Sequence, residues 1–287
     1  MSWLPGKRAW AAISVPVVDD SGATLALARP ARRIVSLAPS ITEELFAIGA
    51  GGTIVGTSAY SDYPPAAGSL PVVAQADTVD LERIAALRPD LIVLWGSGYP
   101  AAAREALARL GVPIYVNEPA SLEGVATSLE RLGHLTGAAD ATAVASRFRS
   151  NVQRLRASYG GRNPVRAFYQ IWPQPLMTLS GRHITSEALA LCGARNVFED
   201  LAPLAPTVSP EAVIAADPQI ILTAEPGGVD RGALDFWKRY PFLSAVKNGQ
   251  LVTLDSNLID RPTPRMLEEV ARLCDKVEAA RHASGMK

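Results

Sequence analysis

The sequence predicts an α/β protein of two Rossmann-like lobes, each with a parallel-rich sheet, joined by one long backbone helix. Apolar strand-like runs alternate with helical patterns, which favours parallel strands covered by helices on both faces. A twelve-residue segment at 82–93 recurs without a gap at 211–222. Between the two copies, residues 138–159 form one amphipathic pattern with apolar residues at three- and four-residue spacing.

The first lobe begins with "IVSLAP" at 34–39, an apolar run typical of a buried strand. A helix is expected to start at Ser40, because Ser40 and Glu43 have the spacing of a capping box. The glycines of "GAGG" are expected to end it. The alternation then predicts strands at 53–58, 90–95 and 112–117 and helices at 80–89 and 101–111, with Asp80 as the cap of the first of these helices.

The second lobe repeats this order after the turn "GGRNP" at 160–164. Its pattern predicts strands at 165–172, 219–224 and 250–255 and helices at 185–194, 210–218 and 263–282. The same alternation of strand and helix therefore occurs in both halves of the chain.

The repeated segment aligns Glu82 with Glu211 and Pro89 with Pro218. A chance match is one explanation, since a helix, a proline and a strand follow one another in many α/β proteins. The gapless match of both glutamates and both prolines favours an internal duplication, in which the segment marks the same position in each lobe.

Composition limits the classes of function. The chain has 287 residues, enough for two domains of about 100–150 residues each. Lys+Arg and Asp+Glu both number 28 and no basic run occurs, which argues against nucleic-acid binding. No apolar window reaches the length of a transmembrane helix.

The expected domain boundaries follow from these patterns. Residues 1–30 form an N-terminal arm, in which a basic pair precedes a short apolar run. This arm is read either as a residual secretion leader or as a disordered start-site artefact. The remaining chain is divided into an N-terminal lobe at 31–137, a bridging helix at 138–160 and a C-terminal lobe at 161–287.

Three aromatic residues, Tyr60, Trp95 and Trp172, lie where predicted strands end. Ligands of α/β proteins bind at the carboxyl ends of parallel strands and at domain interfaces. Aromatic residues at these ends suit the wall of a cleft between the lobes that holds a large flat ligand. The alternative for each is packing in the core. Polar or turn residues also follow strands at Pro39, Ser40 and 257–261.

Motifs for catalysis are missing from the sequence. There is no G-x-S-x-G, no P-loop and no H-E-x-x-H, and "GAGG" follows a helix where a dinucleotide fingerprint would follow a strand. The two cysteines and three histidines lack metal-ligand spacing. The sequence thus predicts neither an enzyme, nor a metal site, nor a cofactor.

Several segments together resemble the periplasmic vitamin B12-binding proteins of ABC importers, within the wider cluster of binding proteins for siderophores, haem and corrinoids. The similarity covers about residues 30–280. It is carried by "RRIVSLAPSITEELFAIGAG", "SAYSDYPP", "DLERIAALRPDLIVLW", "ALCGARNVFED" and "PTPRMLEEVARLC", of which the Y-S-D-Y-P-P turn is the most specific.

The resemblance implies two lobes on a rigid helix, little hinge motion, and cobalamin as the transported ligand in the cleft between the lobes. Trp172 matches a family aromatic within one residue, because its loop is one residue longer here. Tryptophans expected near Ala76, Ala205 and Leu258 are absent. The ligand-binding residues that the resemblance implies are Tyr60, Trp95, Trp172, Asn257, Leu258, Ile259, Asp260 and Arg261.

The resemblance also gives the repeated glutamates and the cysteines a role. Glu82 and Glu211 match the residues that dock on the two subunits of a membrane permease, and Cys192 and Cys274 match a disulfide. Both glutamates also lie in the first turn of a helix, where the macrodipole favours acidic residues, so a purely structural role is the alternative. The resemblance further implies a monomer exported to the periplasm.

Two other classes of function stay open. Within the same fold, a haem receptor would use Tyr60 or His183 as axial ligand, and a ferric-siderophore receptor would use Arg182, Arg261 and Arg265 against an anionic chelate. A metallocluster protein of nitrogenase type or a hydrolase on the same sheet plan is disfavoured, because cysteine ligands are few and no nucleophile motif occurs.

Overall fold

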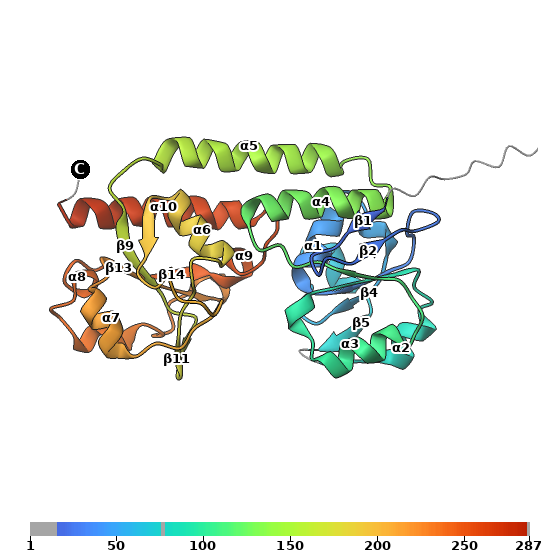
Figure 1. The fold of residues 1–287 in the computed structure, drawn as a ribbon, viewed down its shortest axis with the longest axis horizontal. Coiled ribbons are helices and arrows are strands. Elements are labelled where there is room, and N and C mark those ends of the chain that lie inside the picture. The colour runs from blue at the N-terminus through green and yellow to red at the C-terminus, as the bar shows by residue number, and fades with distance from the viewer. Residues whose placement is uncertain (1–15, 76–77, 286–287) are drawn as a thin grey trace, which may run out of the picture. The chain divides into compact units, whose positions relative to one another are not determined.

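The computed structural model describes residues 16–75 and 78–285, so the first half of the predicted N-terminal arm, residues 1–15, lies outside the described residues. The chain forms two compact units. The first contains the residues up to Glu118 and the stretch Arg131–Asp140; the second contains Pro119–Glu130 and Ala141 onward. Each unit has its own parallel-rich sheet with helices packed against it, which confirms the predicted fold class (Figure 1).

The first unit is built on a six-stranded sheet of order β6-β5-β4-β3-β7-β8, in which only β5 and β6 pair antiparallel. Apolar side chains from the strands and from the helices beside them form one buried cluster. The strands are β3 (Ile34–Leu37), β4 (Ile54–Ser58), β5 (Val72–Gln75), β6 (Thr78–Val79), β7 (Leu91–Leu94) and β8 (Ile114–Val116); the helices are α1 (Pro39–Ala47), α2 (Leu81–Ala86) and α3 (Ala101–Ala108), preceded by a β1–β2 hairpin (Val17–Val18, Thr24–Leu25).

The second unit is built on a four-stranded, fully parallel sheet of order β12-β9-β13-β14. The indole of Trp237 is fully buried in its core, where its Nε1 donates to Oε1 of Gln170 at 2.8 Å. The strands are β9 (Val165–Tyr169), β12 (Ala194–Asn196), β13 (Ile220–Glu225) and β14 (Leu251–Asp255), with a hairpin of β10 (Trp172–Pro173) and β11 (Leu176–Met177); the helices are α5 (Ala141–Tyr159), α6 (Ile184–Leu191), α7 (Pro210–Ala216), α8 (Ser244–Lys247), α9 (Ser256–Ile259) and α10 (Met266–Ala283).

Equivalent positions of the two sheets carry the repeated segment. The order β4-β3-β7-β8 in the first sheet matches β12-β9-β13-β14 in the second, and the two copies supply α2–β7 and α7–β13. In both copies the residue before the proline has a positive φ, 46° at Arg88 and 41° at Asp217. The repetition therefore extends from the sequence to topology and backbone conformation, which favours duplication over a chance match.

The capping box predicted at Ser40 is wrong. Helix α1 begins one residue earlier, with Ala38 as the N-cap and Pro39 in the first turn, and it has no side-chain cap. Proline suits the first helical position, because its fixed φ is helical and its missing N–H has no partner to lose there. Ser40 therefore lies inside the helix, and Glu43 is buried.

Helix α4 (Leu122–Thr136) is not among the helices predicted from the sequence. It begins in the second unit and ends in the first, since the boundary between the units falls at Glu130 and Arg131. Helix α5, predicted to begin at residue 138 and to bridge the lobes, begins at Ala141 and belongs to the second unit.

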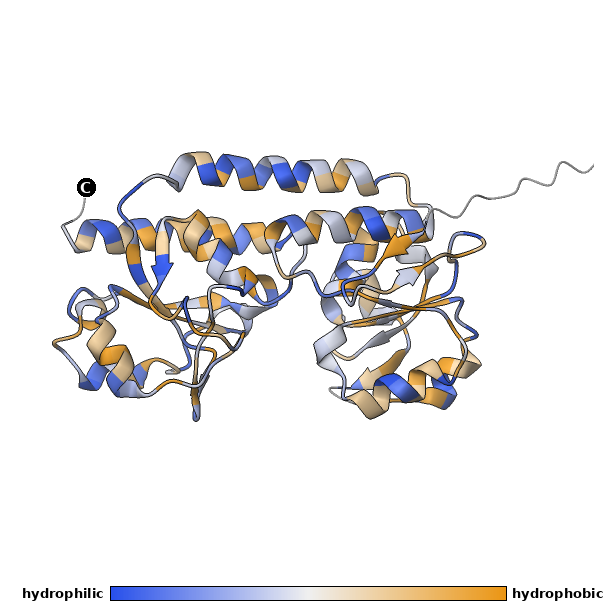
Figure 2. Cartoon of the chain, in the orientation of Figure 1, coloured by the Kyte–Doolittle hydropathy of each residue, from blue (hydrophilic) through white to orange (hydrophobic). Residues whose placement is uncertain are grey.

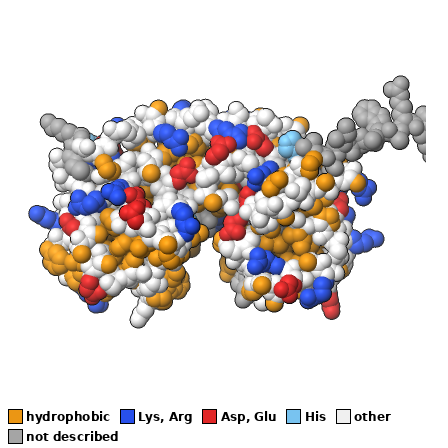
Figure 3. Space-filling view, viewed as in Figure 1, with side chains coloured by type: hydrophobic (Ala, Val, Ile, Leu, Met, Phe, Trp, Pro, Cys, Tyr) orange, Lys and Arg blue, Asp and Glu red, His pale blue; other side chains and the backbone are white. Residues whose placement is uncertain are grey.

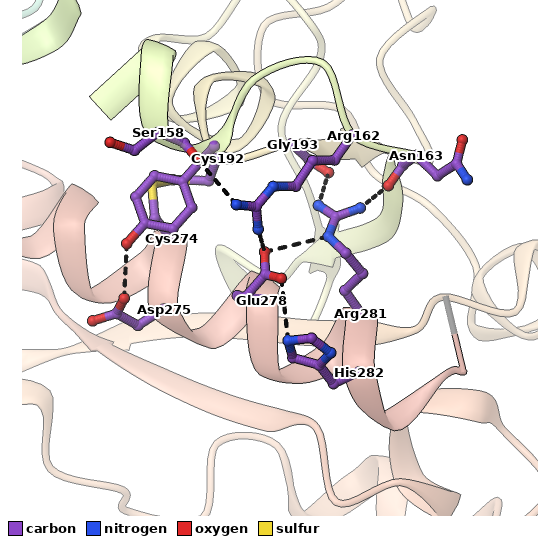
Figure 4. A network of polar contacts seen from close by, with 11 residues as sticks. Ser158, Arg162, Asn163, Cys192, Gly193, Cys274, Asp275, Glu278, Arg281 and His282 are labelled. Atoms are coloured by element: carbon purple, nitrogen blue, oxygen red, sulfur yellow. Dashed lines mark hydrogen bonds and ion pairs between the residues drawn. A yellow bond between two sulfur atoms is a disulfide. The ribbon is translucent and has the colours of Figure 1, made fainter. Parts of the chain in front are cut away.

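Helix α10 is fastened to the second unit by the disulfide of Cys192 and Cys274, the pairing that the resemblance implies. Arg281, only 1% exposed, adds to this attachment by donating to the carbonyl oxygens of Asn163 and Gly193 (Figure 4). Glu278 accepts from Arg281 and from Arg162. The covalent bond and the polar network together attach α10 to the ends of α5 and α6.

Surface patterning agrees with the balanced composition. Hydrophobic and hydrophilic residues alternate along α5 and α10, as amphipathic helices require (Figure 2). Acidic and basic side chains are interspersed on the face shown in Figure 3. Within residues 16–75 and 78–285, no helix combines the length and the hydrophobicity needed to cross a bilayer.

Candidate functional site

Two aromatic residues of the first unit stand exposed at strand ends. Tyr60 follows β4 and is 79% exposed, and Trp95 follows β7 and is 48% exposed. Large aromatic side chains bury most of their surface when they pack in a core. Neither residue is enclosed in the core, and both keep exposed surface.

The backbone of Tyr60 is held in a conformation that tyrosine rarely adopts, with φ at 63°. A row of hydroxyl groups lies beneath this turn. Thr42 of α1 joins Ser36 of β3 at 2.8 Å and donates to Ser61 at 3.2 Å. Ser61 also contacts Ser58 at 3.3 Å. These buried bonds hold the chain on both sides of Tyr60, so the strained turn presents its ring outward.

Trp172 is an exposed aromatic residue of the second unit, in the hairpin that follows β9. It is 58% exposed, and its Nε1 donates to the carbonyl oxygen of Gln174 at 3.0 Å. Antiparallel pairing of Trp172 with Met177 completes the hairpin. The indole nitrogen is thus used within the hairpin, and the face of the ring is what it offers to a ligand.

The loop expected to contact the ligand, 257–261, is the short helix α9 and the two residues after it. Leu258 and Ile259 are buried, whereas Asn257, Asp260 and Arg261 keep exposed surface. Nη2 of Arg261 donates to Oδ1 of Asn257 at 3.3 Å. Any contact of this loop with a ligand is therefore expected from its three polar residues.

Asp260 differs from an ordinary surface carboxylate. Loss of water around its carboxyl group raises the pKa of Asp260 to about 6. A long hydrogen bond of 3.4 Å from the hydroxyl of buried Tyr169 lowers this pKa, and the negative charge of Asp255 raises it. An acid whose pKa is higher in the folded than in the unfolded chain favours folding most when it is protonated.

We therefore expect Asp260→Asn to change the free energy of unfolding more favourably at pH 7.5 than at pH 4. The asparagine keeps an acceptor for Tyr169 but cannot ionise, so the wild type alone loses stability as the pH rises from about 4 to about 6. The residue as a whole keeps exposed surface although its carboxyl group has lost water, so solvent screening reduces the expected difference to roughly 1 kcal/mol. Thermal unfolding of both proteins across this range measures it. An unfolding temperature difference that does not change with pH would contradict the elevated pKa.

Glu82 and Glu211 lie exposed in the first turns of α2 and α7. A side chain caps each helix: Asp80, as predicted, accepts from a backbone N–H in α2, and Ser209 does so in α7. The backbone N–H of Glu211 and the Ser209 hydroxyl lower the pKa of the Glu211 carboxyl. Both repeated glutamates are thus exposed at the start of equivalent helices.

Two of the residues proposed as haem or siderophore ligands, His183 and Arg182, already make hydrogen bonds within the fold. Nδ1 of His183 accepts from the backbone N–H of Thr185, which makes this histidine the cap of α6. Burial lowers the pKa of His183 and so favours the neutral ring. Arg182 donates to the carbonyl oxygen of Ala202. One ring nitrogen of His183 is therefore already hydrogen-bonded within the protein, and the guanidinium of Arg182 is bonded to a neighbouring loop.

Among the described residues, no three side chains of His, Cys, Asp or Glu lie close enough together to hold a metal ion. Of the positions where family tryptophans are absent, Ala205 is exposed, Leu258 is buried, and Ala76 lies outside the described residues. Ser61 and Gln174, which support Tyr60 and Trp172, were not predicted from the sequence. Ser61 lies within the Y-S-D-Y-P-P turn, but its hydrogen bond to Thr42 depends on the fold, and Gln174 belongs to no recognised motif.

Known proteins resemble this chain over most of its length. The pattern of the periplasmic binding proteins matches residues 34–258. The chain belongs to the periplasmic binding protein family. Among its relatives in this family, the vitamin B12-binding protein of Vibrio cholerae is 38% identical over 252 residues, which are 88% of this chain and 91% of the relative. That of Yersinia pestis is 36% identical over 251 residues, 87% of this chain and 88% of the relative.

Solved structures of other periplasmic binding proteins share the fold. The crystal structure of the periplasmic vitamin B12-binding protein BtuF of Vibrio cholerae has a TM-score of 0.79 at 38% identity, covering 88% of this chain and 98% of that one. The haem-binding protein BhuT has a TM-score of 0.75 at 23% identity, covering 86% and 98%, and shares the fold alone.

Proposed function

We propose that this periplasmic binding protein captures cobalamin or a related corrinoid and delivers it to the permease of an ABC importer. The observation that carries the proposal is the exposure of Tyr60 and Trp95 after strands of the first unit and of Trp172 in the β10–β11 hairpin of the second. A corrin ring is large and flat, and exposed aromatic rings bury much of its surface by stacking. Similarity to vitamin B12-binding relatives over nearly the whole chain supports the same ligand.

The proposed action is binding without chemistry. Capture needs shape, apolar surface and a few polar contacts, and Asn257, Asp260 and Arg261 supply polar groups beside the sheet of the second unit. The protein itself needs no cofactor for this role, because cobalamin is its cargo.

The exposed, repeated glutamates support a docking role for Glu82 and Glu211. A permease built as a dimer offers two similar surfaces. Because the two glutamates lie at equivalent positions of the two units, each can contact one permease subunit. We propose that the protein acts as a monomer in the periplasm. The disulfide supports export, because such bonds persist in oxidising compartments.

We expect Trp95→Ala and Trp172→Ala each to weaken cobalamin binding by roughly 1–3 kcal/mol, because each removes an exposed aromatic surface. The wild type should bind in the micromolar range or tighter, about −8 kcal/mol or better. Phe242→Ala is the matched control, since Phe242 is 66% exposed but does not follow a strand. Fluorescence titration of the four proteins measures the difference. Equal affinities for all four would remove the support for aromatic stacking.

Haem is the second candidate. Its specific support is the exposed phenol of Tyr60, a side chain that can ligate iron. Ring stacking of a corrinoid needs the tyrosine ring, whereas haem ligation needs its hydroxyl group. Direct titration with both ligands distinguishes the two candidates.

A further inference from the structure

The loop that carries Trp95 is held at several points within the first unit. It consists of Trp95 and the 3-10 turn Gly96–Gly98, between β7 and α3. The backbone N–H of Ser97 donates to Oε2 of Glu118 at 3.0 Å, and the buried hydroxyl of Tyr99 donates to the carbonyl oxygen of Leu37 at 3.1 Å. These bonds fix the backbone of the loop on the sheet.

The indole of Trp95 packs against the backbone of Gly98. A Cβ atom added at Gly98 would lie 2.7 Å from Cε3 of Trp95, closer than Cβ atoms approach other atoms in proteins, and 3.2 Å from Cδ2, a tight contact. About half of the residue stays exposed beyond this contact. The ring therefore occupies the space that a side chain at Gly98 would need.

Backbone conformation does not explain the glycine at this position. Gly98 is not in the left-handed region, in contrast to Gly111 at 68° and Gly137 at 70° in the same unit. An alanine at position 98 would therefore strain no dihedral angle. Glycine fits position 98 because the indole of Trp95 leaves no room there for a side chain.

We propose that Gly98 is a positioning residue for Trp95, which sets the plane of the indole on which the corrinoid stacks. This inference rests on the proposed function for its ligand, but the placement of the ring is a property of the protein alone. Stacking depends on the distance and tilt between the rings, so a displaced indole covers less of the macrocycle. Gly98 thereby controls affinity without touching the ligand.

The test compares Gly98→Ala with Gly68→Ala. Gly68 also lies in a 3-10 turn of the first unit, but an added Cβ there meets no atom within 4 Å. In protein labelled with 5-fluorotryptophan, the resonance of Trp95 is assigned from Trp95→Ala. We expect Gly98→Ala to shift that resonance and leave those of Trp172 and Trp237 in place. Gly68→Ala should shift none.

Affinity then connects the ring to the ligand. We expect Gly98→Ala to weaken cobalamin binding by up to about tenfold and to add nothing in a Trp95→Ala background. An unmoved Trp95 resonance overturns the inference, whether or not the wild type binds cobalamin. An unchanged affinity, or an equal loss in the Trp95→Ala background, overturns it as well. A wild type that binds no cobalamin overturns the proposed function instead.

Discussion

Reversal of Glu82 or Glu211 to lysine is expected to weaken association with the permease by at least about 2–5 kcal/mol and to leave cobalamin affinity unchanged. Loss of one member of a desolvated charge pair typically costs that much, because the partner's charge stays buried and unpaired. Both side chains are exposed at the first turn of equivalent helices, α2 and α7, and are therefore accessible to a partner.

The competing explanation is that acidic residues merely favour helix starts. Each reversal would then cost about 0.3–1 kcal/mol of folding stability and leave docking intact. Glu268→Lys is the matched control, since Glu268 is exposed in the first turn of α10 but lies outside the repeat. Pull-down with reconstituted permease, beside melting curves of the three variants, separates the explanations. Normal permease binding with a lowered melting temperature would leave docking without support.

Removal of the disulfide is expected to lower the free energy of unfolding by about 4 kcal/mol. Cys192 and Cys274 are 82 residues apart, and in the chain-entropy model a loop of that length strongly restricts the unfolded chain. Both cysteines are fully buried, and α10 is attached to α6 at this point. Loss of the bond leaves α10 attached by the Arg281 network and by its buried apolar residues, such as Leu273 and Val277.

Single variants make this test sharper than the double variant. Either Cys192→Ala or Cys274→Ala breaks the bond, so each alone should cost nearly as much as both together. Small additive effects would indicate two independent thiols. The protein denatured without reductant should expose no thiol to a maleimide, and two after reduction. Two reactive thiols without reductant would contradict the disulfide.

Hydrophobic periodicity and the internal repeat were sufficient to predict the fold class. The repeat could be found because helix, turn, proline and strand occupy equivalent places in both sheets, down to the positive φ of Arg88 and Asp217. Helix α4 was missed although Val125, Leu129 and Leu132 follow helical spacing and are fully buried. Its glycines, Gly124 and Gly133, weaken the helical propensity.

The site could be predicted in part. Exposure of Tyr60 and Trp95 agrees with their place after β4 and β7, because an aromatic residue beyond a strand end leaves the core. Trp172 is exposed for another reason, since β9 ends at Tyr169 and Trp172 lies in the β10–β11 hairpin. Burial of Leu258 and Ile259 could not be read from the loop, since it depends on the turn of α9. The groups that orient the aromatic rings are backbone atoms, hydroxyls and a glycine, and their arrangement arises only when distant segments fold together.

Binding of a corrinoid by this periplasmic binding protein is tested most directly by calorimetric titration of the purified protein with cobalamin, haemin and a ferric catecholate. We expect one-to-one binding of cobalamin in the micromolar range or tighter, about −8 kcal/mol or better, and weaker binding of the other two. Stoichiometric binding of haemin together with no heat from cobalamin would contradict it.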